Sequence, residues 1–255
     1  MSGDLITYRP SDTPIHRLHP LTKFLLVGCS VLGAYLAPVP VLAALLAAVF
    51  TAAIVAGVVS DVCWAAIPIL APLGAGLLVV HGLFTRAGGT PLIRLGPVTV
   101  WREGVVHAVT FFGVLAAFVL VGLVFVTTTH PKKLMVGLTS VGLPRKLGYV
   151  FVASLQLVPD LQRRARRIVD AQRSRGLDTG GSVRKRLRAL IALLSPLLIG
   201  ALISAQTRSL ALEARGFSIN GPRSSVYDLT TTPVDHILRL AGLGFVVALV
   251  GWRLT

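Results

Sequence analysis

Long uninterrupted apolar runs dominate the chain, where a soluble protein would alternate apolar and polar positions. The runs are residues 24–37, 41–59, 64–84, 105–126 and 237–252. A helix that crosses a bilayer needs about 20 mostly apolar residues, and somewhat shorter runs suffice when flanking residues contribute. The pattern therefore predicts an all-α integral membrane protein with about five transmembrane helices.

The polar and turn-forming residues between these runs mark where the helices end. Pro38 and Pro40 separate the first two runs, and proline both ends a helix and opens the next, so a tight turn is expected there. Residues 85–104 contain a Gly-Gly pair, two prolines and three arginines, which indicates a loop or short hairpin.

Two further apolar stretches, residues 147–157 and 189–205, are harder to place. If both crossed the bilayer, the arginine-rich stretch between them would lie outside the cell, against the preference of Lys and Arg for the cytoplasmic side. Long amphipathic helices lying at the cytoplasmic face are the favoured interpretation.

Composition agrees with a membrane protein and locates its charge. Hydrophobic residues make up 54% of the 255 residues and charged residues only 14%, so the apolar surplus must face something other than water. The formal net charge is +15, and 17 of the 25 Lys and Arg residues lie within residues 127–233. This concentration indicates a cytoplasmic segment of a multi-pass protein of the cell membrane.

These boundaries divide the chain into three regions. Residues 1–126 are expected to form a cytoplasmic start and a four-span bundle, residues 127–233 a basic cytoplasmic region, and residues 234–255 a C-terminal transmembrane helix. Arg17 and Lys23 precede the first apolar run as in a signal peptide, but several more runs follow, so this run is interpreted as a retained span.

The basic region contains a helical pattern that ends in Ser174-Arg175-Gly176. Arg166, Arg167 and Arg173 lie on the same expected helix, and Gly176 is placed as its C-terminal cap. Forty residues later the chain repeats this ending as Ala214-Arg215-Gly216. Either copy alone is typical of an ordinary helix C-terminus, since arginine favours the negative end of the helix dipole.

Two copies of the ending suggest more than two ordinary caps. Two exposed arginines in the same local frame suit two similar acidic pockets, such as those on a pair of homologous subunits.

With these two endings the chain resembles the transmembrane, or T, component of energy-coupling factor transporters, which take up vitamins or transition-metal ions. The strongest marks are the two Ala-Arg-Gly-like signatures. Supporting marks are the stretch from Ile15 to Lys23, the threonines 127–129 before His130-Pro131, Gly142-Leu143-Pro144 and Pro159. Ser174 replaces the usual alanine, and His19 and Leu21 stand where an acidic and a basic residue are expected.

The resemblance implies a division of labour. Two ABC-type ATPase subunits bind ATP and Mg²⁺ and hydrolyse ATP, a substrate-binding membrane S component captures the solute, and this chain couples them without a cofactor or catalytic residues of its own. Carried over to this sequence, Arg175 and Arg215 dock onto the ATPases, and Ser174, Gly176, Ala214 and Gly216 permit the close approach. Arg166, Arg167 and Arg173 would support the contact.

Other functions fit the residues less well. The main alternative is a multi-span enzyme acting on a lipid or polyprenyl substrate, but its acids, Asp160, Asp170, Asp178, Glu213 and Asp228, are scattered. A permease that moves its own substrate would need charged groups inside its spans, and these are few.

Metal and nucleic-acid binding are also disfavoured. His81 and His107 lie within or beside spans, where a hydrogen-bonded neutral histidine is more common than a metal ligand, so no metal site is assigned. The four basic residues in 184–188 suit anionic membrane lipid better than nucleic acid, because no aromatic residues are interleaved with them. The solute itself is not encoded in any recognisable motif.

Overall fold

The computed structural model describes residues 13–84, 91–95, 98–176, 183–217, 219 and 230–254. Contacts divide the chain into two compact units, one formed by Met1–Val141 with Tyr227–Thr255 and the other by Gly142–Val226. The expected coupling region, residues 127–233, is longer than the second unit because the helix after residue 130 packs within the first unit.

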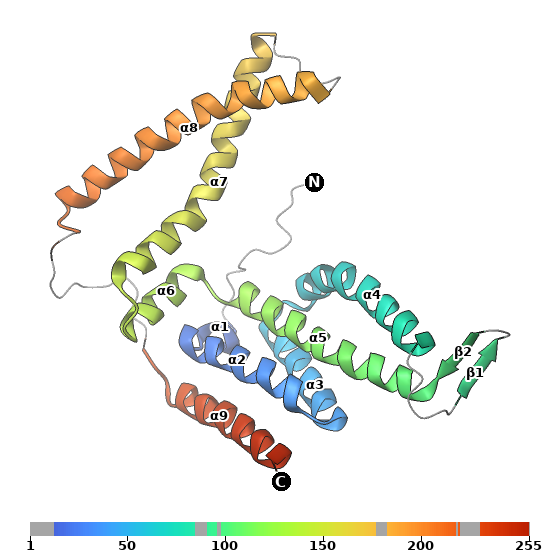
Figure 1. Ribbon diagram of the computed structural model, residues 1–255. Coiled ribbons are helices and arrows are strands. Elements are labelled where there is room, and N and C mark those ends of the chain that lie inside the picture. Colours follow the sequence, from blue (N-terminus) through green and yellow to red (C-terminus); the bar gives the residue numbers. More distant parts are fainter. Residues whose placement is uncertain are drawn as a thin grey trace. The chain divides into compact units, whose positions relative to one another are not determined.

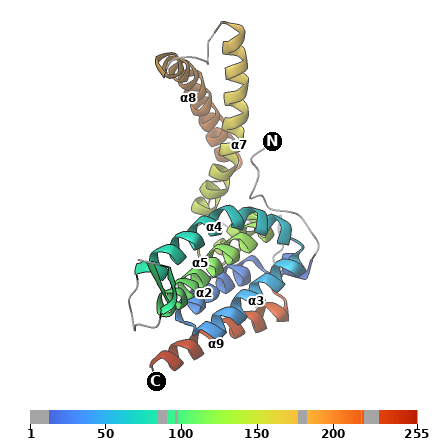
Figure 2. The ribbon, with the colours of Figure 1, turned by 90° about the vertical axis from the view of Figure 1, so that its right-hand side faces the viewer.

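The first unit is a helical bundle with one hairpin (Figure 1). Its elements are α1 (Pro14–Arg17), α2 (Pro20–Leu36), α3 (Val39–Ala56), α4 (Val59–Phe84), β1 (Pro91–Leu95), β2 (Val98–Trp101), α5 (Arg102–Thr128), α6 (Pro131–Ser140) and α9 (Pro233–Leu254). Helix α5 packs against α2, α3 and α4, and α9 packs along α2 (Figure 2). The strands pair antiparallel, which confirms the short hairpin predicted before α5.

The predicted integral membrane architecture is confirmed. Five helices in the described part of the chain are long and apolar enough to span a membrane, namely α3, α4 over Val59–His81, α5, α8 over Leu190–Ala214, and α9. Helix α2 is apolar but shorter. Residues 189–205 are expected at the cytoplasmic membrane face from the charge distribution, yet α8 has the length and composition of a span.

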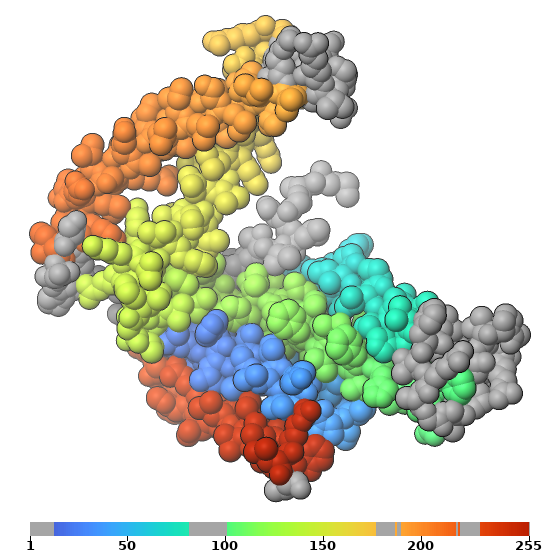
Figure 3. All heavy atoms as spheres, viewed as in Figure 1, coloured from blue at the N-terminus to red at the C-terminus, as the bar shows by residue number. Residues whose placement is uncertain are grey.

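Small residues let the helices of the bundle approach closely, as is common in membranes. A β-carbon at Gly33 of α2 would lie 2.6 Å from Cε1 of Phe245 in α9, and one at Gly74 of α4 would lie 2.8 Å from Cε2 of Phe112 in α5. The tight packing of α9 on α2 is visible in the space-filling view, where red and blue atoms adjoin (Figure 3).

A buried carboxylate ties the two ends of the chain together within this unit. Asp235 is fully buried at the start of α9, and its Oδ2 accepts hydrogen bonds from the backbone N and Oγ1 of Thr232, at 2.9 and 2.7 Å. The carboxylate thus reaches back to the residue before the helix, which is the carboxylate half of a capping box. Its Oδ1 accepts a bond from the backbone N of His19, at 2.9 Å, so α2 and α9 begin at a shared anchor.

Two further bonds extend the anchor to α5. The guanidinium Nε of Arg239 donates to Thr22 Oγ1 at 2.8 Å, and Lys23 Nζ donates to the carbonyl oxygen of Thr128 at 2.8 Å. Thr22, Lys23 and Thr128 are all buried. Buried polar groups must be paired to avoid a large desolvation cost, so this network fixes the relative positions of three helix ends.

Two His-Pro dipeptides start helices in the same way. His19 precedes Pro20 of α2 and His130 precedes Pro131 of α6, and each imidazole Nδ1 accepts a bond from the backbone N two residues later, at 3.2 and 3.1 Å. An accepting Nδ1 requires the neutral ring. Burial lowers the pKa of both histidines, and the positive charge of Arg239 lowers the pKa of His19 further, which keeps the caps neutral.

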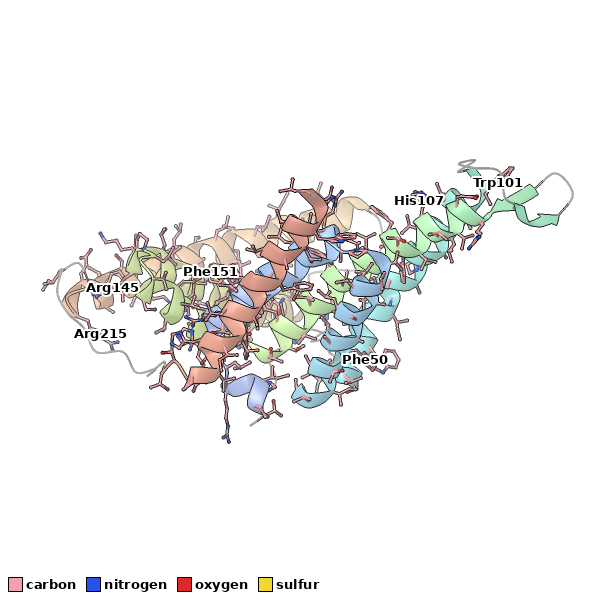
Figure 4. The ribbon with its side chains drawn as sticks, turned by 90° about the horizontal axis from the view of Figure 1, so that it is seen from below. Phe50, Trp101, His107, Arg145, Phe151 and Arg215 are labelled. Carbon is pink, nitrogen blue, oxygen red and sulfur yellow. The ribbon has the colours of Figure 1, made fainter. Side chains whose placement is uncertain are left out.

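The second unit consists of two long helices, α7 (Arg145–Ser174) and α8 (Val183–Ala214), which pack against each other (Figure 1). Both keep helical structure through an internal proline, Pro159 and Pro196. Large apolar side chains of both helices are exposed, for example Phe151 of α7, labelled in Figure 4, and Leu202 of α8.

The capping histidines predict a pH-dependent stability of the bundle. Because their folded pKa values lie below the ordinary value, the unfolded chain takes up protons first as pH falls below about 6.5, and stability is lost in that direction. Thermal unfolding in detergent is expected at lower temperature at about pH 5 than at about pH 7.5. The His19→Asn and His130→Asn double variant, whose amide oxygens can cap without titrating, should lose much of this dependence.

The control is His236→Asn at an exposed position, which should leave the pH dependence unchanged. Equal pH dependence in the double variant and the wild type would contradict the role of the two caps.

Candidate functional site

The first signature forms the C-terminal end of α7. Ser174 is the last helical residue, and its Oγ donates back to the carbonyl oxygen of Asp170 at 3.1 Å. Gly176 has φ +85° and its backbone N donates to Arg173 O at 2.9 Å, as in a left-handed C-terminal cap. The cap predicted at Gly176 is confirmed, and it leaves Arg175 exposed at the helix end.

The second signature ends α8 in the same geometry. Gly216 has φ +68°, its backbone N donates to Glu213 O at 2.8 Å, and Phe217 N donates to Leu212 O at 2.9 Å. These two bonds define a Schellman motif. Arg215, just before the glycine, is exposed (Figure 4).

The glycine is needed at these two caps for a physical reason. A side chain in the left-handed region costs roughly 1–2 kcal/mol, and a β-carbon at Gly216 would also lie 3.1 Å from Ile219 Cδ1. At Gly176 no neighbour lies within 4 Å of the built β-carbon, so the backbone conformation alone favours glycine.

The two signatures lie at opposite ends of the α7–α8 pair. The rings of Tyr149, near the start of α7, and Phe217, just after α8, lie with centroids 5.1 Å apart. Arg215 is therefore beside the beginning of α7, whereas Arg175 follows its end. A 30-residue helix is roughly 45 Å long at 1.5 Å per residue, so the two arginines are too far apart to enter one pocket.

A polar contact not identified from sequence holds the two helices together. Arg164 Nη1 donates to Ser204 Oγ at 2.6 Å and to the carbonyl oxygen of Gly200 at 3.0 Å. Asp160 accepts from Arg163 and Arg164 of its own helix and from Arg208 of α8, at 3.5, 3.3 and 3.3 Å. The signal available in the sequence is Gly200 and Ser204 at helical spacing, small enough to admit a guanidinium.

The remaining residues expected to contact the ATPases lie on the surface of α7 and α8. Arg166, Arg167 and Arg173 are exposed on α7. Asp178 and Asp228 lie outside the described residues, as do the four basic side chains within residues 184–188. Ala214 is the last residue of α8 and is exposed.

No cluster of three metal-ligating side chains occurs within the described ranges. His81 lies against Phe111, with ring centroids 6.5 Å apart, and His107 is exposed (Figure 4). Among the described carboxylates, Asp160 forms ion pairs with Arg163, Arg164 and Arg208. The arrangement presents charged helix ends and apolar faces, and these are the properties of a binding surface.

The sequence matches known proteins over most of its length. The family model described as cobalt transport protein, CbiQ, matches residues 11–226. A protein of Acidaminococcus fermentans named energy-coupling factor transporter transmembrane protein EcfT is 30% identical over 270 residues, covering 96% of this chain and 95% of its own length. A protein of the same name from Leuconostoc gelidum subsp. gasicomitatum is 32% identical over 181 residues, 67% of this chain and 66% of that protein.

A third relative has a different name and a greater length. A Bifidobacterium longum protein named as an ABC transporter ATP-binding protein is 30% identical over 253 residues, which are 94% of this chain but only 32% of that protein. The chain thus spans about a third of this relative.

The cap geometry predicts opposite effects for two glycine substitutions in or beside α8. Gly216→Ala should destabilise the end of α8 by roughly 1–2 kcal/mol and displace Arg215, because the left-handed conformation is strained for alanine. Gly200→Ala, whose β-carbon would meet Arg164 Nη1 at an ordinary 3.8 Å, should be neutral or stabilising by up to about 1 kcal/mol.

Hydrogen exchange of the last turn of α8 in both variants measures the difference. Unchanged protection in Gly216→Ala, or equal loss in both variants, would contradict this account of the cap.

Proposed function

The chain belongs to the EcfT/CbiQ family, whose members are the non-catalytic transmembrane components of energy-coupling factor transporters. We propose that it couples two ABC-type ATPase subunits to a substrate-binding membrane S component. In this proposal the ATPases bind ATP and Mg²⁺, and Arg175 and Arg215 each dock into one of them. The membrane-enzyme alternative is set aside, since family members are not catalysts.

The placement of the two signatures carries the proposal. The caps expose Arg175 and Arg215 in the same local frame, on helix ends separated by the length of α7. Two equal contacts at two distant points suit a pair of homologous ATPases, each offering one acidic groove. Arginine fits such grooves well because its planar guanidinium makes paired hydrogen bonds with carboxylates.

The long Bifidobacterium relative supports a partnership with ATPases. That protein, by its name an ATP-binding protein, contains a segment similar to almost all of this chain. In that relative, an ATP-binding part and a segment similar to this chain are joined in one polypeptide. This favours an association of this chain with separate ATP-binding subunits.

The apolar surface of α7 and α8 supports a second partner. The described stretch Leu190–Ala214 has no buried residue, and exposed apolar side chains include Leu194, Leu198 and Leu202. A membrane S component would cover this apolar face while the charged ends bind the ATPases. Closure of the ATPases on ATP would then move the helix ends and tilt or release the S component.

Coupling to ATPases implies a side of the membrane for the α7–α8 unit and a class of transported solute. The α7–α8 unit, with its basic helix ends, lies on the cytoplasmic side, where ATP is available. The cargo is a vitamin or a transition-metal ion, and the name of the matched family favours a metal ion such as cobalt, bound by the S component.

Co-purification from the native membrane tests the docking arginines. Wild-type protein should retain ABC ATPases, Arg175→Glu and Arg215→Glu should each weaken retention about tenfold or more, and the double variant should lose it, because reversal leaves like charges facing each other. Bound proteins are identified by mass spectrometry.

The matched control is Arg102→Glu, an exposed charge reversal at the start of α5 and outside both signatures. It should retain the ATPases. Absence of any ATPase with the wild type, or equal loss in the control, would overturn the proposal.

A further inference from the structure

The first unit contains an apolar cavity that the coupling function does not use. Its volume is about 630 Å³, within the range of roughly 300–1,000 Å³ typical of ligand pockets. It lies among α2, α3, α5 and α9, with Val27, Val49, Phe125 and Phe245 among its walls.

One side of the cavity is accessible from outside the bundle. Ala44 and Ala48 of α3 line it and yet remain exposed, because no described side chain covers them. Helix α3 is a membrane-span candidate, so this opening faces the surroundings of a membrane helix. A cavity with apolar walls is poorly suited to water, whereas a hydrocarbon chain can fill it.

The cavity has one polar end. Lys23 and Thr128 belong to its lining, and Lys23 Nζ donates to the Thr128 carbonyl oxygen. Lys133, exposed in the first turn of α6, is near enough for its positive charge to act on Lys23. Their mutual repulsion would be relieved by an anion placed between them.

The nearby carboxylate does not neutralise this end. Asp235 lies close to Lys23, but its two oxygens accept bonds from His19 and Thr232, and Arg239 adds a further positive charge beside them. Lys23 thus brings a positive charge into the lining of an apolar cavity, and Lys133 and Arg239 add positive charge near that end from outside the lining. A phosphate group joined to a hydrocarbon chain matches both parts.

We propose that this cavity binds one anionic phospholipid, with an acyl chain along α3 and the phosphate at Lys23 and Lys133. Basic pockets between transmembrane helices are a known setting for anionic head groups. Lys23 lies one residue before the apolar run of α2, at the depth where a head group meets the hydrocarbon region.

A cavity-filling variant with a neighbouring control tests the site. The full-length protein is purified in mild detergent and analysed by native mass spectrometry after addition of phosphatidylglycerol or phosphatidylcholine. Wild type and Ala47→Phe should each retain one phosphatidylglycerol, because Ala47 is exposed on α3 outside the cavity lining. Ala48→Phe should lose it, since the new ring occupies the cavity.

The head-group contact is tested separately at Lys133, which is exposed and can be changed without opening the buried network. Lys133→Gln should weaken phosphatidylglycerol retention about fivefold and leave the weaker phosphatidylcholine retention unchanged. Thermal unfolding of each variant confirms that it is folded.

Three results would overturn the proposal. These are equal lipid retention in Ala48→Phe and Ala47→Phe, equal retention of the two lipids by the wild type, and loss of a co-purified membrane protein, with no loss of lipid, in Ala48→Phe. The last result would identify the cavity as the binding site of a protein partner. ATPase docking at Arg175 and Arg215 is independent of all three.

Discussion

The contact of Arg164 with Gly200 and Ser204 is the interaction on which the α7–α8 pair depends. Few residues of α7 and α8 are fully buried, since Gly148 is the buried residue of α7 and the apolar stretch of α8 has none. The bonds of Arg164, together with Asp160 and Arg208 and the ring contact of Tyr149 with Phe217, hold the crossing of the pair. The positions of the two signatures follow from this crossing.

The membrane bundle is stabilised differently. Its helices interlock through small residues such as Gly33 and Gly74, and a buried polar network around Asp235 joins the starts of α2 and α9. This gives a rigid support for α9 and α2, while the exposed apolar faces of α7 and α8 remain available to partners. A rigid anchor and a pair of helices with few fully buried residues suit the proposed transmission of movement.

Sequence predicted the features that depend on local or one-dimensional patterns. The spans α3, α4, α5 and α9 follow from apolar run length, whereas the predicted span at residues 24–37 forms the shorter helix α2. The glycine caps follow from residue type, because only glycine adopts the left-handed conformation cheaply. The network around Asp235 could not be predicted, since it joins residues more than 200 positions apart. His19 was seen as a departure from an expected acidic residue, and the structure supplies the carboxylate there from Asp235.

The character of α8 was also difficult to assign from sequence. Its apolar stretch is long enough to span a membrane. The basic residues at its start and the exposed apolar face along its length, however, suit a helix that contacts other subunits. Hydropathy measures how apolar a helix is, and it does not tell whether lipid or a protein partner covers the apolar face. The distinction depends on partners that a single chain does not contain.

The central claim is that ATP moves the two signature ends relative to each other. Spin labels at Ala171→Cys and Ala211→Cys, exposed sites three residues before Ser174 and Ala214, report this distance in the assembled transporter after replacement of Cys29 and Cys63. Pulsed electron resonance should show a shorter distance with trapped ATP than without nucleotide. An identical distance distribution in both states, in a transporter that hydrolyses ATP and takes up its solute, would contradict the account.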